Sequence, residues 1–306
     1  MTILSRRTFT LSTLALGIGA LAGPARAQAG TTSLTTSLGT YDIPLDPQRV
    51  VAVDFRLDVE PALALGLPVI AYGVQEERIE WIPMAADAVF IGGPPSREAI
   101  IGLNPDLIVC TDIPGSEYWP IDQLTPIAPT LPVDYELSWQ ANLTRMGAWL
   151  GRAERAAAFI ADYEASIAAV RSAHAARLAG SKLAAIWYEP DTSEVQVLLG
   201  EGTTNVTLAG QVLSDLGGTT VSPGALGDYG VVSIENAGTV LGDVEGFLLD
   251  ASEPARLEAL EAHPIWQRIP AVAAGRVYRT PGTFYGGGYS ARRLVGEWAK
   301  LLALLD

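Results

Sequence analysis

The longest regular pattern in the chain is an amphipathic helix predicted over 152–178. This stretch contains no Gly or Pro and is rich in Ala, which favours the helical conformation. Large apolar side chains recur at steps of three and four, at Phe159, Tyr163, Ile167 and Val170, and therefore share one face of the helix. At ~1.5 Å per residue the helix would be roughly 40 Å long. The pattern lasts too few heptads for a coiled coil.

Before this helix, short apolar runs alternate with helical patterns. The apolar runs, which we predict to be strands, lie at 49–53, 68–72, 88–91 and 107–110. The helical patterns lie at 58–65 and 97–103. This alternating part of the sequence ends at 126–132. Uninterrupted runs of Val, Ile and Leu between helices are typical of a parallel sheet that is covered on both faces.

The sequence after the helix repeats this alternation. Strands are predicted at 183–187, 195–199, 246–249 and 276–280, and helices at 206–216, 253–262 and 291–305. The predicted fold class is α/β, with two Rossmann-like lobes joined by a single long helix and a ligand cleft between the lobes. We place the N-terminal lobe at 28–140, the linker with the bridging helix at 141–180 and the C-terminal lobe at 181–306.

A short segment recurs in both predicted lobes. Ser96-Arg97-Glu98 opens one predicted helix and Ser233-Ile234-Glu235 opens another, and each helix leads into a strand. Each Ser is suited to cap a helix N-terminus, and each Glu lies in the first turn, where a carboxylate suits the helix dipole. Capping alone is sufficient to account for both glutamates.

The N-terminus resembles an export signal. Arg6 and Arg7 precede Phe9, an apolar run covers 11–22, and Ala-Arg-Ala ends at Ala27. This pattern predicts a signal peptide at 1–27, cleaved before Gln28, of the twin-arginine type; a general secretory signal with a chance Arg pair is the alternative. No Cys follows the signal to carry a lipid, and no later run approaches the ~20 apolar residues of a membrane span. We expect a freely diffusing periplasmic protein.

The charge balance makes nucleic-acid binding improbable. The whole chain has a formal net charge of −14, and removal of the leader with its three Arg residues leaves a still more acidic protein. Such a protein repels phosphate backbones. An anionic ligand would need local Arg residues in its binding site.

Residue types that carry metal or catalytic chemistry are scarce. Cys110 is the only Cys and lies in an apolar run, where a buried strand thiol is expected. His174 and His263 are the only His residues, which argues against a protein-bound zinc or iron site. Neither a nucleophile elbow nor a phosphate-binding loop occurs. Gly286-Gly287-Gly288 is interpreted as a flexible pocket rim or a plain turn. These observations favour a binding protein over an enzyme.

Aromatic residues gather at the ends of predicted elements, where clefts form in α/β lobes. The candidates for a ligand cleft are Trp81, Tyr118, Trp119, Trp187, Tyr188, Tyr229, Phe284 and Tyr285. Packing in the core is the alternative role for about half of such residues. We assign Trp139 and Trp266 to packing.

Several segments together resemble one known family. They lie at 47–52, 63–66, 98–108, 232–235, 263–267 and 269–278. Through them the chain is similar to the periplasmic binding proteins of ABC importers for iron-siderophores and vitamin B12. The resemblance covers essentially the whole mature chain and implies two lobes with one long helix as the sole bridge. It also implies a monomer whose Glu98 and Glu235 dock onto arginines of an inner-membrane permease dimer.

The segment 280–287 is most similar to ferric hydroxamate-binding proteins. That resemblance implies that Phe284 or Tyr285 covers the ligand and that Tyr229 contacts it. Where those proteins carry a ligand-binding Arg, this chain has Gly92-Gly93. The cations that could replace it are Arg56, Arg78 and Arg97. We expect a neutral or cationic ferric hydroxamate whose siderophore supplies every iron ligand, with no covalent cofactor.

Other functions fit the same pattern less well. A cobalamin- or haem-binding protein of this fold would also have aromatic walls, and haem would use Tyr285 or Tyr289 as an axial ligand. An exported enzyme acting on a metal chelate is a further alternative, as is a binding protein that serves a sensor. A single helical bridge resists wide hinge motion, so we expect a largely preformed cleft.

Overall fold

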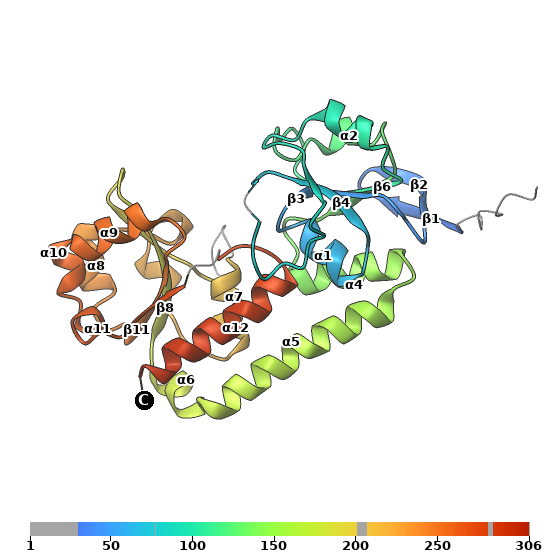
Figure 1. The fold of residues 1–306 in the computed structure, drawn as a ribbon. Coiled ribbons are helices and arrows are strands. Elements are labelled where there is room, and N and C mark those ends of the chain that lie inside the picture. The colour runs from blue at the N-terminus through green and yellow to red at the C-terminus, as the bar shows by residue number, and fades with distance from the viewer. Residues whose placement is uncertain (1–29, 77, 201–206, 281–283, 306) are drawn as a thin grey trace, which may run out of the picture.

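The computed structural model describes residues 30–76, 78–200, 207–280 and 284–305; the predicted signal peptide lies outside these ranges. Figure 1 shows two lobes, each built on its own sheet, with helices running beneath both. The predicted α/β class with two lobes is thus confirmed. No helix in the described part of the chain is long and apolar enough to cross a membrane.

The first lobe contains a five-stranded parallel sheet in the order β5-β4-β3-β6-β7. Its strands are β3 (Val50–Asp54), β4 (Val69–Gly73), β5 (Val89–Phe90), β6 (Leu107–Thr111) and β7 (Thr130–Val133). Its helices are α1 (Val59–Ala64), α2 (Arg97–Leu103) and α3 (Ile121–Leu124).

Two features of the first lobe differ from the sequence prediction. An antiparallel hairpin of β1 (Thr31–Thr36) and β2 (Gly39–Pro44) precedes the sheet. Its largely polar Thr and Ser residues gave no apolar pattern. Strand β7 overlaps the segment 126–132, where the sequence predicts only the end of the alternating pattern. Pro132 interrupts its pattern, and such a residue is tolerated on an edge strand, which β7 is.

The second lobe contains a mixed sheet in the order β10-β9-β8-β11-β12. Its strands are β8 (Leu183–Glu189), β9 (Glu194–Val197), β10 (Val231–Ser233), β11 (Gly246–Asp250) and β12 (Val277–Thr280). Strands β8, β11 and β12 are parallel, while β9 is antiparallel to both of its neighbours. The helical segments are α7 (Leu208–Asp215), η1 (Pro223–Ala225), η2 (Asp228–Gly230), α8 (Ile234–Val240), α9 (Pro254–Ala262), α10 (Pro264–Gln267) and α11 (Pro270–Ala273).

The predicted bridging helix is divided. After α4 (Trp139–Trp149), the long helix α5 (Ala153–Ala173) ends before His174, and α6 (Ala175–Gly180) follows. His174 has φ −121° and ψ 26°, outside the helical region. Gly180 is the last residue of α6 and does not adopt the left-handed conformation of a helix cap. The following helix α6 buries Leu178 in the core shared by the two lobes, and no Gly or Pro marks the break at His174.

A second helix also connects the lobes. Helix α12 (Gly288–Ala303) runs beside α5 (Figure 1) and contacts both α7 of the second lobe and α1 of the first. In the described residues the chain passes between the two sheets once, through α4, α5 and α6, as the resemblance implied. Helix α12 packs on both lobes beside α5 and adds a second support.

The buried apolar side chains form three clusters. The largest is continuous from the first lobe through α4, α5, α7 and α12 to the second, and includes Leu65, Tyr163 and Trp298. Each lobe has a further cluster on the other face of its sheet. Cys110 belongs to the outer cluster of the first lobe and is fully buried, as predicted. A shared core of this kind stabilises one relative placement of the lobes.

Candidate functional site

A cleft of about 980 Å³ lies between the two lobes. The first lobe contributes residues that follow β3, β6 and β7, and the second contributes α7 and the segment before α12. The carboxyl ends of parallel strands are where ligands bind in open α/β sheets. The lining residues that carry polar or aromatic groups are Arg56, Thr111, Trp119, Asp134, Tyr135, Glu136, Ser138, Trp139, Asn142, Gln211, Ser214, Asp215 and Tyr285.

Arg56 lies in the cleft directly after β3. Asp54 fixes the turn that carries it, because one carboxylate oxygen accepts hydrogen bonds from the backbone N–H groups of Arg56 (2.7 Å) and Leu57 (2.8 Å). Nε of Arg56 lies 3.7 Å from the same oxygen. The guanidinium lies 4.6 Å from the ring of Phe55 and 5.9 Å from that of Tyr285. Arg56 therefore contacts aromatic rings of both lobes, and its charge is offset by Asp54.

A buried network behind Arg56 also orients Trp119. Nε1 of Trp119 donates to Asp54 at 3.3 Å. Asp58 accepts from the backbone N–H of Asp54 and from the hydroxyl of Thr111, both at 2.8 Å. Burial, followed by the nearby Asp54 carboxylate, raises the pKa of Asp58 well above its usual range. The network fixes the positions of one cation and one indole at the cleft wall.

The three consecutive glycines are closely packed and are not a loose rim. A Cβ on Gly286 would lie 2.6 Å from the Glu60 carboxylate, and one on Gly288 would lie 2.4 Å from the ring of Phe159. Gly286 also has φ +139°, which side-chain-bearing residues rarely adopt. All three glycines line the cleft. Absence of side chains thus allows this segment to lie against α1 and α5.

The floor of the cleft joins α7 to α4 and α5. Asp215 accepts a 2.5 Å hydrogen bond from the hydroxyl of Tyr163, and Gln211 donates to Gln140 at 3.2 Å. Burial and the Asp215 carboxylate raise the pKa of Tyr163. Trp139, which we assigned to packing, is 9% exposed and stacks edge-on against Tyr163 at 5.1 Å, but it also lines the cleft.

The structure brings three of the ten predicted ligand residues into the cleft lining: Arg56, Trp119 and Tyr285. Two others lie next to them in sequence. Tyr118 is 40% exposed, with its ring 6.3 Å from that of Trp119. Phe284 is fully buried, and its carbonyl accepts from the backbone N–H of Leu208.

The other predicted ligand residues lie elsewhere in the structure. Arg78 donates to the carbonyls of Ala85 and Ala88. Trp81 donates to Ser290 and stacks under Arg293.

Residues of the second lobe account for the rest. Trp187 and Tyr188 line a small pocket against α9, with Arg256 over the Trp187 ring at 4.8 Å. Tyr229 is 59% exposed in η2, with a left-handed φ of 59° that is unusual for an aromatic residue. Neither of these locations lies in the lining of the large cleft.

Glu98 and Glu235 are both exposed in the first turns of α2 and α8. Ser96 caps α2 by accepting from the backbone N–H of Ala99 at 3.2 Å. The expected cap at Ser233 is absent, because its side chain accepts from Asn236 instead of a backbone N–H of α8. Capping therefore explains only the first of the two segments.

No sequence pattern pointed to the segment 134–138, which connects β7 to α4 and lines the cleft. Tyr135 and Leu137 are 55% and 42% exposed there. A prediction of β7 would have placed them after a strand end, where the other candidates were found. Among the described residues, no group of three or more His, Cys, Asp and Glu could hold a metal ion.

Two α/β lobes that enclose a large cleft with aromatic walls define a protein that binds a small molecule between its lobes. A family model described as periplasmic binding protein matches residues 89–283. The chain is 30% identical over 295 residues to the ferric enterobactin-binding periplasmic protein FepB of Escherichia coli O6:H1, covering 88% of this chain and 90% of that protein. It is 28% identical over 269 residues to the iron(3+)-hydroxamate-binding protein FhuD of Escherichia coli K12, covering 82% and 86%.

A solved periplasmic solute-binding protein of Mycobacterium smegmatis matches with a TM-score of 0.74 at 20% identity, covering 90% of this chain and 99% of that one. That similarity supports the fold. The chain belongs to the periplasmic binding protein family. Membership confirms the predicted family and the prediction of a binding protein in place of an enzyme.

Proposed function

We propose that this protein captures a ferric siderophore in the periplasm and delivers it to an inner-membrane ABC permease. The names of both relatives support this proposal, since each binds an iron complex. A cleft of about 980 Å³ is large enough for a metal chelate of that size class. In this proposal the siderophore supplies all of the iron ligands.

The charged residues that line the cleft favour one type of siderophore over another. Among the described lining residues, Arg56 is the only base, while Asp134, Glu136 and Asp215 are acids. The Arg56 charge is offset by Asp54 and the Asp134 charge in part by Arg145, so the lining keeps an excess of acids. A ferric trihydroxamate is neutral, whereas a ferric tricatecholate is strongly anionic and would be repelled by these carboxylates. The two relatives differ in ligand at similar identity, so the charge argument favours a neutral or cationic hydroxamate complex.

Three side chains are the proposed contacts in the cleft. Trp119 lines the cleft from the first lobe and Tyr285 from the second, and the guanidinium of Arg56 lies 5.9 Å from the Tyr285 ring. Aromatic faces bury apolar ligand surface, while one cation can hydrogen-bond the hydroxamate oxygens. Trp119→Ala and Arg56→Met should each weaken binding.

Tryptophan fluorescence titration with ferrichrome, a ferric tricatecholate, haem and cobalamin tests the proposal. Ferrichrome, a neutral ferric trihydroxamate, should quench the fluorescence at the lowest concentration. Tighter binding of the tricatecholate would reject the hydroxamate assignment but keep siderophore binding. A Soret band with haem, or a response to cobalamin alone, would reject siderophore binding.

The partner and the compartment are part of the same proposal. Exposed Glu98 and Glu235 would contact arginines of the permease, where charge-assisted pairs fix the orientation of docking. The predicted signal at 1–27 would direct export, and the relative FepB is periplasmic by name.

A further inference from the structure

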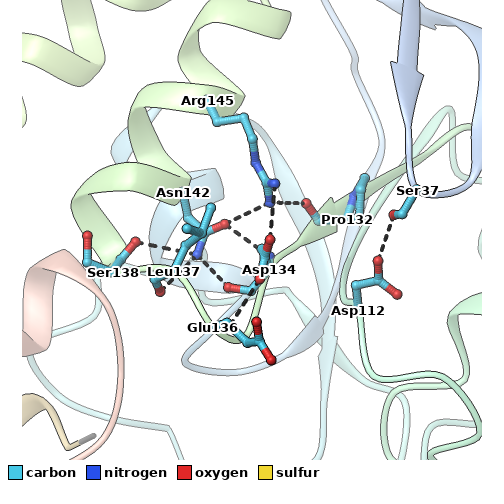
Figure 2. Close-up of polar contacts among 9 residues, drawn as sticks. All are labelled: Ser37, Asp112, Pro132, Asp134, Glu136, Leu137, Ser138, Asn142 and Arg145. Carbon is cyan, nitrogen blue, oxygen red and sulfur yellow. Dashed lines mark hydrogen bonds and ion pairs between the residues drawn. The ribbon is translucent and has the colours of Figure 1, made fainter. Parts of the chain in front are cut away.

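The rim segment 134–138 is held by the side chain of one buried residue, Asn142 (Figure 2). Asn142 is 5% exposed. Its Oδ1 accepts from the backbone N–H of Asp134 at 3.0 Å, and its Nδ2 donates to the Asp134 carbonyl at 2.8 Å. Longer contacts of 3.4 Å reach the carbonyls of Leu137 and Ser138. The backbone hydrogen bonds of the sheet end with β7, and beyond it the Asn142 side-chain amide bonds the Asp134 backbone instead.

Arg145 reinforces this arrangement from the next turn of α4. Its Nη2 donates to Oδ1 of Asn142 at 3.0 Å and to the carbonyl of Pro132 at 3.2 Å. Its Nη1 lies 3.5 Å from the Asp134 carboxylate. The ring of Trp149 lies 4.9 Å from the guanidinium and fixes it from the side. The strand end, the segment and α4 therefore form one connected unit.

The segment also makes hydrogen bonds at both of its ends. The Asp134 carboxylate accepts from the backbone N–H of Glu136 at 3.0 Å. The Ser138 hydroxyl caps α4 by accepting from the backbone N–H of Ala141 at 3.2 Å. Figure 2 shows the Asp134–Glu136 contact together with the contacts of Asn142 and Arg145, all of which lie around this segment.

The two large apolar side chains on this rigid segment are left uncovered. Tyr135 and Leu137 line the cleft with 55% and 42% of their surface exposed. Ordering a backbone segment costs conformational entropy, and here that cost is not offset by burial of the side chains it carries. A preordered segment of this kind lowers the entropic cost of binding a ligand.

We infer that the rim segment 134–138 is a preorganised ligand-contact element, with Tyr135 and Leu137 as specificity-determining residues and Asn142 as a positioning residue. The inference rests on the proposed function. The ring of Tyr135 and the side chain of Leu137 cover the aliphatic spacers between the chelating groups of the siderophore. The chelating oxygens themselves face Arg56. Spacer length and bulk are thereby recognised separately from the iron centre.

Ferrichrome titrations of the full chain test this inference. Tyr135→Ala and Leu137→Ala should each raise the Kd roughly tenfold, while Tyr135→Phe should stay near wild type, because the ring and not the hydroxyl makes the contact. Leu304→Ala is the matched control, since Leu304 is 50% exposed and lies outside the cleft lining. Its Kd should equal that of the wild type.

Asn142→Ala tests the positioning role through a double-mutant cycle. The Kd of Asn142→Ala should rise, and amide hydrogen exchange over 134–138 should quicken. Because Asn142 positions both contact residues, adding Asn142→Ala to the pair Tyr135→Ala and Leu137→Ala should bind no more weakly than that pair alone. A further loss of affinity in that background would show that Asn142 does not act through the two side chains and would overturn its role. If Asn142→Ala does not fold, the Kd values of Tyr135→Ala and Leu137→Ala still test whether the segment contacts the ligand.

The outcomes separate this inference from the proposed function. Binding of ferrichrome by the wild type with unchanged Kd in Tyr135→Ala and Leu137→Ala would overturn the rim inference alone. Absence of binding by the wild type to any ferric siderophore would overturn the proposed function and the contact role together.

Discussion

Glu60 of α1 accepts two hydrogen bonds from Ser290 of α12, one from its backbone N–H at 2.9 Å and one from its hydroxyl at 2.6 Å. Nε1 of Trp81 donates to the same hydroxyl at 3.1 Å. Both partners are buried. Since Ser290 closely follows the cleft-lining segment 285–288, these bonds fix that segment of the second lobe against the first.

Glu60→Ala should destabilise the protein and weaken ligand binding together. The substitution leaves buried donors of Ser290 without an acceptor, which costs about 1–3 kcal/mol. Urea denaturation and ferrichrome titration measure the two effects. Ser290→Ala keeps the backbone hydrogen bond but removes the hydroxyl that bonds Glu60 and Trp81, so it should cost about 1–2 kcal/mol, less than Glu60→Ala. Equal stability of Glu60→Ala and wild type would show that these hydrogen bonds do not hold the two lobes together.

Gly288→Ala and Gly296→Ala should change stability in opposite directions, although both lie in α12. A Cβ at Gly288 would clash with Phe159 and Trp139, whereas at Gly296 nothing lies within 4 Å. Overpacking at Gly288 should cost about 1–3 kcal/mol. At Gly296 the higher helix propensity of Ala should add about 0.5–1 kcal/mol. Thermal unfolding of the two variants is the measurement, and stabilisation by both would refute the close packing.

The stability of the protein should fall as pH rises, and Asp58→Asn should reduce that dependence. The pKa of Asp58 is raised in the folded state, so the folded protein keeps a proton that the unfolded chain has released. The stabilisation is complete below the ordinary carboxyl pKa and is lost as pH rises through the raised value.

Guanidinium unfolding of both proteins between about pH 4 and pH 8 measures this difference. Some slope should remain in the variant, because burial also raises the pKa of Glu60 and Asp250. Identical slopes in Asp58→Asn and wild type would show that Asp58 does not contribute.

Replacing Glu98 and Glu235 together by Ala should abolish uptake while leaving the ligand affinity unchanged. Both side chains are exposed and neither lines the cleft. Transport into permease-containing vesicles and fluorescence titration separate the two properties. Glu258→Ala on α9 is a control, since it removes an exposed acid from outside the two recurring segments. A loss of affinity in the double variant would refute the docking role.

Small-angle scattering curves of free and ligand-bound protein should nearly superpose. The lobes share one apolar core through α5 and α12, and the Glu60–Ser290 bonds add a polar connection. Packed cores resist continuous deformation. A marked compaction on ligand addition would contradict a preformed cleft.

The candidate site was only partly accessible from the sequence. Trp119 was identified because it lies near the end of a predicted element, which is a local feature. Arg56 was one of three cations considered as a replacement for the Arg of the ferric hydroxamate-binding proteins, and the sequence did not distinguish it from Arg78 and Arg97. The rim residues Tyr135 and Leu137 were missed because Pro132 obscured β7. The contact between Glu60 and Ser290 joins residues 230 positions apart, and no local pattern links them.

The sequence by itself determined the α/β class, the division into two lobes and the bounds of α2, which agree with the prediction residue for residue. Hydrophobic periodicity and capping residues act over a few positions, so they can be recognised without knowledge of the fold. The tertiary structure alone decided where α5 ends, that α12 supports both lobes and which aromatic residues face the cleft. Those outcomes depend on contacts between distant segments, whose energies are fixed only when both lobes are assembled around their shared core.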